Sequence, residues 1–182
     1  MGQPKHLLTL PDGRTMPQRA ADVAAEAGAS AIVVVLGADA PAVAATLDQV
    51  HVAINDQWEQ GMGGSIRVGL EAVLADEPDA VLILLADQPR VEADDLRRLI
   101  EAGGEGIAAS RYDNAVGVPA YFGRRFFPLL LELPAAVGAK QLLRRLDDVA
   151  LVELPHAAAD VDTPADARLL IGEQTERLGE AS

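Results

Sequence analysis

The chain contains no cysteine and very few aromatic residues, since phenylalanine, tryptophan and tyrosine together make up 3% of its 182 residues. Without cysteine it cannot form a disulfide bond, a thiolate metal site or a cysteine nucleophile, and we expect a cytoplasmic location. With so few aromatic side chains, the core must be built from alanine, valine, leucine and isoleucine. That composition is typical of parallel strands covered by helices.

Long apolar segments and basic clusters are also missing. The longest apolar runs, at residues 31–36 and 80–86, are too short for a membrane span, and no signal-peptide pattern opens the chain. The formal net charge is −13, and no basic stripe offsets it locally. We therefore expect neither a membrane nor a nucleic acid as a partner. If such an acidic protein handles a polyphosphate, a divalent cation must lie between the like charges.

The first half of the chain alternates between strand and helix patterns. The runs at 31–36 and 80–86 are short, continuous and rich in branched residues, and both predict buried strands. This alternation indicates an α/β fold with a mostly parallel sheet wound by right-handed crossovers. The length favours a single domain over residues 1–182. Helical spacing predicts helices at 17–27, 41–47, 65–74 and 92–102, with Ser65 as the N-cap of the third.

The second half of the chain is less regular. Thr163 as an N-cap, with Pro164 at the first helical position, predicts a last helix. The polar tail after Gly172 is expected to fray. The other predicted elements are strands at 106–111 and 117–122, for which an antiparallel arrangement is one possibility, helices at 124–133 and 139–146, and a strand at 149–154.

Asp87 directly follows the most apolar run of the chain, and Gln88 and Pro89 end that run sharply. In open parallel sheets, ligands bind beyond the carboxyl ends of the strands. A carboxylate at the rim of a rigid strand is a good ligand for a hard cation. The alternative is that Asp87 only caps a helix or a turn, so position alone leaves both interpretations open.

A second acidic point lies near the C-terminus, where Asp160 and Asp162 precede Thr163 and Pro164. We expect only one of the two carboxylates to face the same site as Asp87. The alternative is that both simply precede a helix N-terminus, where negative charge is favourable.

A glycine-rich loop at 61–64 is expected to lead into a helix at Ser65. Glycine lets backbone amides approach a ligand closely, and a helix N-terminus favours an anion or a hydrogen-bond acceptor. The alternative is an ordinary loop with glycine turns. Lys5, near the start of the chain, could hold a phosphate or could be an ordinary terminal lysine.

Five motifs occur in order along nearly the whole chain. They are Met1-Gly-Gln-Pro-Lys5-His-Leu-Leu8, Asn55-x-x-Trp58-x-x-Gly61-Met-x-x-Ser65-Ile-x-x-Gly69-Leu70, Leu85-Ala-Asp87-Gln-Pro89, Gly117-Val-Pro119-x-x-Phe122 and Asp160-Val-Asp162-Thr-Pro164-x-Asp166. Any one motif is weak, but five in sequence are specific. Together they resemble the motifs of the MobA-like NTP transferase family, and most closely those of its molybdenum cofactor cytidylyltransferases (MocA-like).

The resemblance implies a Rossmann-like three-layer α/β/α sandwich and the transfer of CMP from CTP to the phosphate of molybdopterin, with release of pyrophosphate. Such a transfer depends mainly on positioning and charge neutralisation. The implied ligands of Mg²⁺ are Asp87 and Asp162, with Asp160 as the rival of Asp162, and Lys5 would neutralise phosphate charge. A molybdoenzyme or its chaperone is the implied protein partner. The other implied site residues are Gly2, Gly61 and Ser65 for the nucleotide, and Gly117 and Pro119 for the acceptor.

The chain departs from the family at its start. Members begin with an apolar strand and a glycine-rich, arginine-bearing loop that helps to separate CTP from GTP users, and Met1 stands where an internal methionine normally follows them. We therefore expect an N-terminally truncated member with exposed apolar edges on the strands beside the missing one. Val118, where cytidylyltransferases often carry histidine, and Ala136–Val137, in place of a charged pair, also differ from the family pattern.

Two other functions stay open. The first is a guanylyltransferase, or another NTP transferase that acts on a small phosphorylated acceptor. Stabilisation of the protein by GTP rather than by CTP would favour it. The second is a non-catalytic accessory domain that binds a nucleotide or a cofactor and passes it to a partner.

Overall fold

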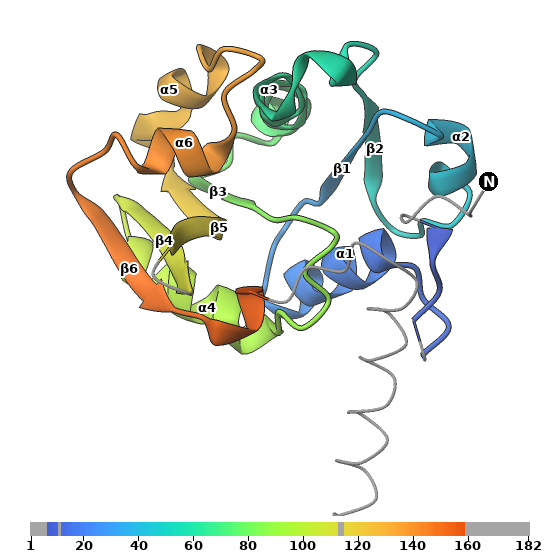
Figure 1. The fold of residues 1–182 in the computed structure, drawn as a ribbon, viewed down its shortest axis with the longest axis horizontal. Helices are drawn as coiled ribbons and strands as arrows, with labels where there is room; N and C mark the ends of the chain where they lie inside the picture. The colour runs from blue at the N-terminus through green and yellow to red at the C-terminus, as the bar shows by residue number, and fades with distance from the viewer. Residues whose placement is uncertain (1–6, 11, 113–114, 159–182) are drawn as a thin grey trace, which may run out of the picture.

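The computed structural model describes residues 7–10, 12–112 and 115–158, in which helices and strands alternate (Figure 1). Short 3₁₀ turns, such as Trp58–Gln60 and Pro155–Ala158, connect some of these elements. The main elements are α1 (Met16–Glu26), β1 (Val33–Leu36), α2 (Ala40–Ala44), β2 (His51–Ile54), α3 (Met62–Val73), β3 (Ala80–Ile83), α4 (Ala93–Gly103), β4 (Ile107–Tyr112), β5 (Ala115–Gly123), α5 (Phe127–Leu131), α6 (Ala139–Leu143) and β6 (Val149–Glu153).

The strands form two sheets. One consists of β1 and β2, which pair in parallel. The other has the order β3-β5-β4-β6, in which β5 is antiparallel to both of its neighbours and β6 is parallel to β4. Because β3, β4 and β6 share one direction and only β5 opposes them, the predicted α/β fold with a mostly parallel sheet is confirmed. The strands predicted at 106–111 and 117–122 do pair in antiparallel fashion.

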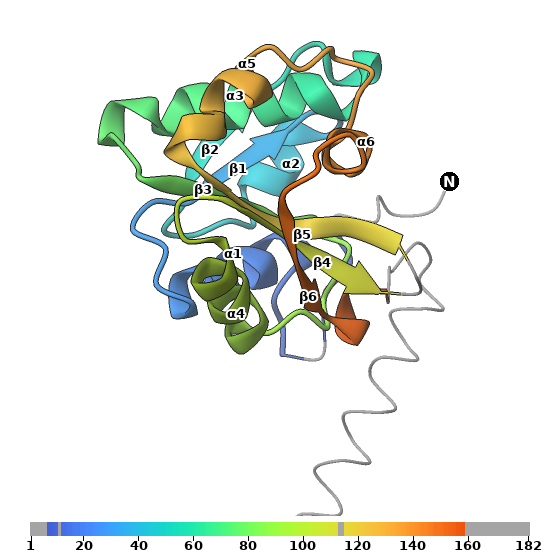
Figure 2. The same cartoon turned by 90° about the vertical axis from the view of Figure 1, so that its left-hand side faces the viewer.

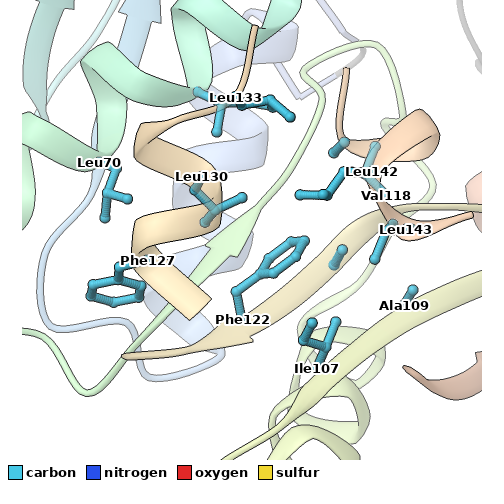
Figure 3. Packing of buried hydrophobic residues seen from close by; sticks show 13 residues of the cluster. Leu70, Ile107, Ala109, Val118, Phe122, Phe127, Leu130, Leu133, Leu142 and Leu143 are labelled. Carbon is cyan, nitrogen blue, oxygen red and sulfur yellow. The ribbon is translucent and has the colours of Figure 1, made fainter. Parts of the chain in front are cut away.

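Helices cover both faces of the four-stranded sheet (Figures 1 and 2). Successive side chains of a strand point to opposite faces, and β5 shows the consequence clearly. Phe122 packs with α3, α5 and α6 on one face, whereas Tyr121 packs with α1 and α4 on the other. Figure 3 shows Phe122 and Ile107 of the sheet facing Leu130 of α5. The molecule therefore has the three layers that the resemblance implies.

The two apolar runs that predict buried strands are only half-buried in the structure. Strand structure covers Val33–Leu36 and Ala80–Ile83, and of these residues only Leu36 is fully buried. In the described part of the chain, β1 pairs only with β2 and β3 only with β5, so each has one edge without a partner strand. The prediction of buried strands is thus wrong in degree, and the exposure of apolar edges beside a missing strand stays a prediction.

Strand β2 was not predicted. Its four residues, His51–Ile54, are exposed at both ends and half-buried in the middle, which is too short a pattern to show a period. The strand forms because β1 offers its edge. The N–H of His51 donates to the carbonyl of Ile32 at 2.9 Å, and the N–H of Asn55 donates to that of Leu36 at 2.8 Å. A partner that is distant in sequence therefore creates this strand.

The predicted helices of the first half all exist, but α3 starts earlier than expected. It begins at Met62 with Gly61 as its N-cap, so the assignment of Ser65 as N-cap is wrong. The first amides of a helix need partners outside the helix. Here the N–H of Gly63 donates to the carbonyl of Ala135 at 2.9 Å, which lets the helix begin without a capping side chain.

In the second half, the helices are shorter than predicted. The segment 124–133 divides into a 3₁₀ turn, Arg124–Phe126, and the short helix α5, and the segment 139–146 is helical only at Ala139–Leu143. Pro128 at the start of α5 favours a new helix start there, because its fixed backbone angle suits the first turn. The helix predicted at Thr163 lies outside the described residues.

Candidate functional site

Asp87 lies in the turn that follows β3, beyond the carboxyl end of that strand, as predicted. Its side chain is half-buried, and its oxygen Oδ1 is fully enclosed. A recess beside this turn is lined by Met16 and Arg19 of α1, by Leu84, Leu85, Ala86, Gln88 and Pro89, and by Pro119 of β5. The Nε of Arg19 donates to the carbonyl of Pro89 at 2.8 Å, which holds the turn against α1.

Gln88 connects this turn to two segments that are distant in sequence. Its side-chain nitrogen Nε2 donates to the carbonyl of Val118 at 3.2 Å and to the carbonyl of Ala157 at 2.7 Å. The residue is buried, with 4% of its surface exposed. Gln88 is part of the Leu85–Pro89 motif, but no function is predicted for it from the sequence. The sequence feature that could have pointed to a role for Gln88 is a long polar side chain placed directly after an apolar strand.

The Gly117–Pro119 segment lies in β5, next to the Asp87 turn. A β-bulge interrupts the pairing with β4 there, so that Ala109 lies opposite Ala120 but Ser110 lies opposite Gly117. The hydroxyl of Ser110 donates to the carbonyl of Pro119 at 2.6 Å. The Val118–Pro119 peptide bond is cis. The structure thus places two predicted site segments, Asp87 and Gly117–Pro119, side by side through Gln88.

Gly117 has a steric reason to be glycine. A Cβ at this position would lie 2.6 Å from the hydroxyl oxygen of Tyr112, which is closer than real contacts allow. Any larger residue would require the ring of Tyr112 to move away from β5. The predicted acceptor-binding role of Gly117 stays a prediction, and the structure adds this packing role.

Ser65 lies in the first turns of α3, and its hydroxyl contacts the neighbouring strand end. The Nδ2 of Asn55, just beyond β2, donates to the Oγ of Ser65 at 3.0 Å, and the Oδ1 of Asn55 accepts from the N–H of Gln57 at 3.0 Å. Asn55 is buried, with 5% of its surface exposed. Since Ser65 accepts this hydrogen bond, its own proton is available to donate to a ligand.

The glycines before Ser65 are in contact with the protein itself. A Cβ at Gly61 would lie 2.6 Å from the carbonyl oxygen of Ala135, and one at Gly63 would lie 2.2 Å from that of Pro134. The expectation of a glycine-rich loop at 61–64 is therefore wrong, because α3 already begins at Met62, and Gly61 and Gly63 allow this helix to pack closely on the 134–137 segment. That segment leads into α6, which packs on β5, so it connects the Ser65 region to the Gly117–Pro119 region.

Trp58, the single tryptophan of the chain, lies at the carboxyl end of β1, where it covers Gly37. A Cβ at Gly37 would lie 2.4 Å from Cγ of Trp58, so the indole rests directly on the backbone. Trp58 is nevertheless 44% exposed. This end of β1 thus presents an aromatic surface to solvent.

Four predicted site residues, Gly2, Lys5, Asp160 and Asp162, lie outside the described residues. The meeting of Asp87 with Asp162 or Asp160 therefore stays a prediction. Within the described part of the chain, no group of three or more histidine, aspartate or glutamate side chains is arranged to hold a metal ion. In proteins, Mg²⁺ is usually held by one or two carboxylates together with substrate phosphates. The carboxylate of Asp87 would supply one ligand of such a site.

In the portion that the structure describes, no helix is long and apolar enough to cross a lipid bilayer.

The chain is similar to several known proteins. It is 32% identical over 175 residues to the nicotine blue oxidoreductase of Paenarthrobacter nicotinovorans, covering 88% of this chain and 84% of that protein. It is 33% identical over 112 residues to the purine catabolism protein PucB of Bacillus subtilis, covering 59% of this chain but only 55% of that protein. The chain thus spans about half the length of PucB.

Solved structures show the same similarity. The crystal structure of Rv0371c from Mycobacterium tuberculosis superposes with a TM-score of 0.73 at 31% identity, covering 94% of this chain and 91% of that one. A complex of Rv0371c with manganese superposes with a TM-score of 0.69 at 30% identity, covering 92% and 90%.

The family comparison covers most of the sequence. The model of the MobA-like NTP transferase domain matches residues 1–149, which include the Asp87 turn, the Ser65 helix and the Gly117–Pro119 segment. These three parts are also the ones that the structure connects through Gln88 and the 134–137 segment. Taken together, the match and the fold show that the chain belongs to the MobA-like NTP transferase family.

Proposed function

We propose that this protein is a Mg²⁺-dependent nucleotidyltransferase that transfers CMP from CTP to the phosphate of molybdopterin and releases pyrophosphate. The observation that carries the proposal is the place of Asp87, a half-buried carboxylate beyond the carboxyl end of β3, whose neighbour Gln88 donates to the carbonyl of Val118 in the Gly117–Pro119 segment. Family membership supplies the class of reaction. The five sequence motifs support the choice of CTP and molybdopterin.

The reaction joins an acceptor phosphate oxygen to the α-phosphorus of CTP, while the bond from that phosphorus to the β-phosphate oxygen breaks. The leaving group is pyrophosphate, so the electron pair of the broken bond stays on it. Such a transfer needs positioning and charge neutralisation more than covalent chemistry from the protein. This protein carries a formal net charge of −13, so it cannot approach a triphosphate without cationic help.

Each predicted site residue would have a separate role in this transfer. Asp87, with Asp162 or its rival Asp160, would hold the Mg²⁺ that screens the phosphate charge, and Lys5 would neutralise phosphate charge directly. Gly2, Gly61 and Ser65 would contact the nucleotide, with the hydroxyl proton of Ser65 available for it because Asn55 already donates to that oxygen. Gly117 and Pro119 would shape the acceptor pocket. The manganese complex of Rv0371c supports a divalent cation.

The test measures pyrophosphate release by the full-length protein with Mg²⁺ and molybdopterin, using CTP and GTP in parallel. We expect turnover with CTP, and a loss of at least about 100-fold in the Asp87→Asn variant, because a lost charge contact at a phosphoryl centre costs this much. The matched control is Asp79→Asn. Asp79 directly precedes β3, at the opposite end of the same strand, and is fully exposed, so its variant should keep full turnover.

Three outcomes would contradict the proposal. Turnover with GTP alone, or with a sugar phosphate in place of molybdopterin, would instead identify the other NTP transferase. Binding of a nucleotide without any turnover would identify a non-catalytic accessory protein. Equal activity in the Asp87→Asn and Asp79→Asn variants would remove Asp87 from the site whatever the substrate is.

A further inference from the structure

We propose that the indole ring of Trp58 is the surface on which the base of the bound nucleotide stacks. This inference rests on the proposed function, because it names the group that would hold the base of that nucleotide. The proposed function assigns Gly2, Gly61 and Ser65 to the nucleotide, but it assigns no residue to the flat face of the base.

The indole of Trp58 is held in place by its contact with Gly37, at the carboxyl end of β1. A Cβ at Gly37 would lie 2.4 Å from Cγ and 2.9 Å from Cδ1 of Trp58. The backbone of Gly37 has no positive φ, so the close approach of the indole is the reason for glycine at this position. The ring is therefore positioned before any ligand binds, which lowers the entropy cost of binding.

Exposed apolar side chains are concentrated around Trp58. In the described part of the chain six large apolar side chains are exposed, and three of them, Ile54, Trp58 and Met62, lie within residues 54–62. Ile54 ends β2, and Met62 begins α3, so the group lies at the carboxyl end of the two-stranded sheet. Ligands of parallel sheets bind at this end of the strands. Clustered apolar side chains at such a position indicate a surface that a ligand covers.

The charges beside Trp58 favour the base of a nucleotide over its phosphates. Asp56 and Glu59 lie close to Trp58 in the sequence, and both are exposed. Carboxylates repel a triphosphate, but they accept hydrogen bonds from an amino group on a base, such as that of cytosine. A base is neutral, flat and polar only at its edge. It is therefore the part of a nucleotide that fits an aromatic surface with acidic neighbours.

Asn55 connects Trp58 to the helix that carries Ser65. The N–H of Trp58 donates to the carbonyl of Asn55 at 3.2 Å, and the Nδ2 of Asn55 donates to the Oγ of Ser65 at 3.0 Å. Because Asn55 is buried, water competes little for either bond. One residue thus fixes the aromatic surface relative to the hydroxyl that is assigned to the nucleotide.

The first experiment uses Trp58 itself as the reporter, since it is the only tryptophan of the chain. The unmodified protein is titrated with CTP, with GTP and with inorganic tripolyphosphate, each in the presence of Mg²⁺. A base that stacks on the indole changes its fluorescence, so we expect quenching by both nucleotides and none by tripolyphosphate, which has no base. Equal quenching by tripolyphosphate would overturn the inference. So would unchanged fluorescence with a nucleotide that calorimetry shows to be bound.

The second experiment compares Trp58→Leu, which keeps an apolar cover on Gly37 but has no ring, with Trp58→Phe, which keeps a flat ring. Calorimetry measures the dissociation constant for CTP. We expect at least about tenfold weaker binding to Trp58→Leu and less than about a threefold change in Trp58→Phe, because a base–aromatic stack contributes an effect of this size. The matched control is Leu74→Ala. Leu74 is also exposed and lies just beyond the other end of α3, so its variant should bind CTP like the unmodified protein.

Unchanged binding of CTP to Trp58→Leu, or an equal loss in Trp58→Leu and Trp58→Phe, would contradict a stacking role. Every base has a flat face, so the loss in Trp58→Leu should be similar for GTP. A loss confined to CTP would show recognition of the edge of the base and would also overturn the inference. If Trp58→Leu does not fold, the fluorescence titration and the affinity of Trp58→Phe decide the question.

The two proposals can fail separately. If CTP binds and quenches Trp58 but no pyrophosphate is released, the proposed function fails and the stacking role stands. If pyrophosphate is released while Trp58→Leu binds CTP as tightly as the unmodified protein, the stacking role fails and the function stands. If no nucleotide binds at all, both proposals fail.

Discussion

The two sheets of the molecule differ greatly in how well they are enclosed. The four-stranded sheet has helices on both faces, and the central strands β4 and β5 are largely buried. The two-stranded sheet has two short strands, and its buried cluster consists of Leu36, Ala40 and Val43. The motifs of the family are divided between them. Asp87 and the Gly117–Pro119 segment lie in the well-packed part, whereas Asn55 follows β2 in the thinly packed part.

This difference suggests that one part holds groups rigidly and the other part opens locally. The proposed phosphoryl transfer would need its charged groups held rigidly, and the turn of Asp87 is attached to the four-stranded part. Regions with few buried apolar contacts open locally at low cost, and ligand-binding parts of proteins are often of this kind. Trp58 lies on the thinly packed side and is the only tryptophan of the chain, so tryptophan fluorescence would monitor that part alone.

The largest effect is expected from a matched pair of leucines, one from each part. Leu130 of α5 is fully buried in the large cluster, and Leu36 of β1 is 7% exposed in the small one. We expect Leu130→Ala to lower the free energy of unfolding by about 4 kcal/mol and Leu36→Ala by about 2 kcal/mol, because the loss grows with the cavity that remains. Urea unfolding followed by circular dichroism measures both, and equal losses would contradict the comparison.

The next effect concerns the contact between α3 and the 134–137 segment. Gly63→Ala would place a Cβ 2.2 Å from the carbonyl oxygen of Pro134, and we expect a loss of about 1–3 kcal/mol from this overpacking. Gly64→Ala is the matched control, because its nearest neighbour, Nδ2 of Asn55, would be at an ordinary 3.4 Å. Alanine there should gain up to about 1 kcal/mol from helix propensity. Thermal unfolding measures the stability of the two variants. A similar loss of stability in both would show that the contact with the 134–137 segment is not the cause.

The smallest effect is expected at the surface before α1. Arg14 pairs with Asp12 at 2.7 Å and with Asp22 at 2.7 Å. Burial alone would raise the pKa of Asp12, but the hydrogen bonds and the charge of Arg14 outweigh it and lower that pKa below its ordinary value of 3.8. Because these groups are about one-third exposed, we expect Arg14→Met to cost about 0.5 kcal/mol.

The pH dependence of that effect follows from the lowered pKa. A carboxyl group with a lowered pKa in the folded state stabilises the fold above its unfolded pKa, and this contribution disappears as the pH falls through the folded value. The difference between Arg14→Met and the unmodified protein should therefore be full near neutral pH, begin to fall near pH 3.8 and vanish only below the lowered pKa of Asp12. It should also shrink in high salt. A difference that grows on acidification would contradict this assignment.

Local signals in the sequence predicted much of the fold. Helical spacing over 17–27 marked α1 correctly, because the pattern of apolar side chains on one helix face depends on residues only three and four positions apart. The turn at Asp87 was predicted for the same reason, since Gln88 and Pro89 end the apolar run. By contrast, β2 and the early start of α3 were not predicted, because both depend on hydrogen bonds to distant segments.

The sequence by itself determined the family, the alternation of helices and strands, and the place of Asp87 at a strand end, since all three are written in consecutive residues. Only the tertiary structure decided that Gly61 and Gly63 pack against the 134–137 segment, and that Gln88 joins Val118 to Ala157. The physical reason is that these contacts bring together residues 30 to more than 70 positions apart. Hydrogen bonds and close packing at that separation depend on how the layers stack, which no local pattern specifies.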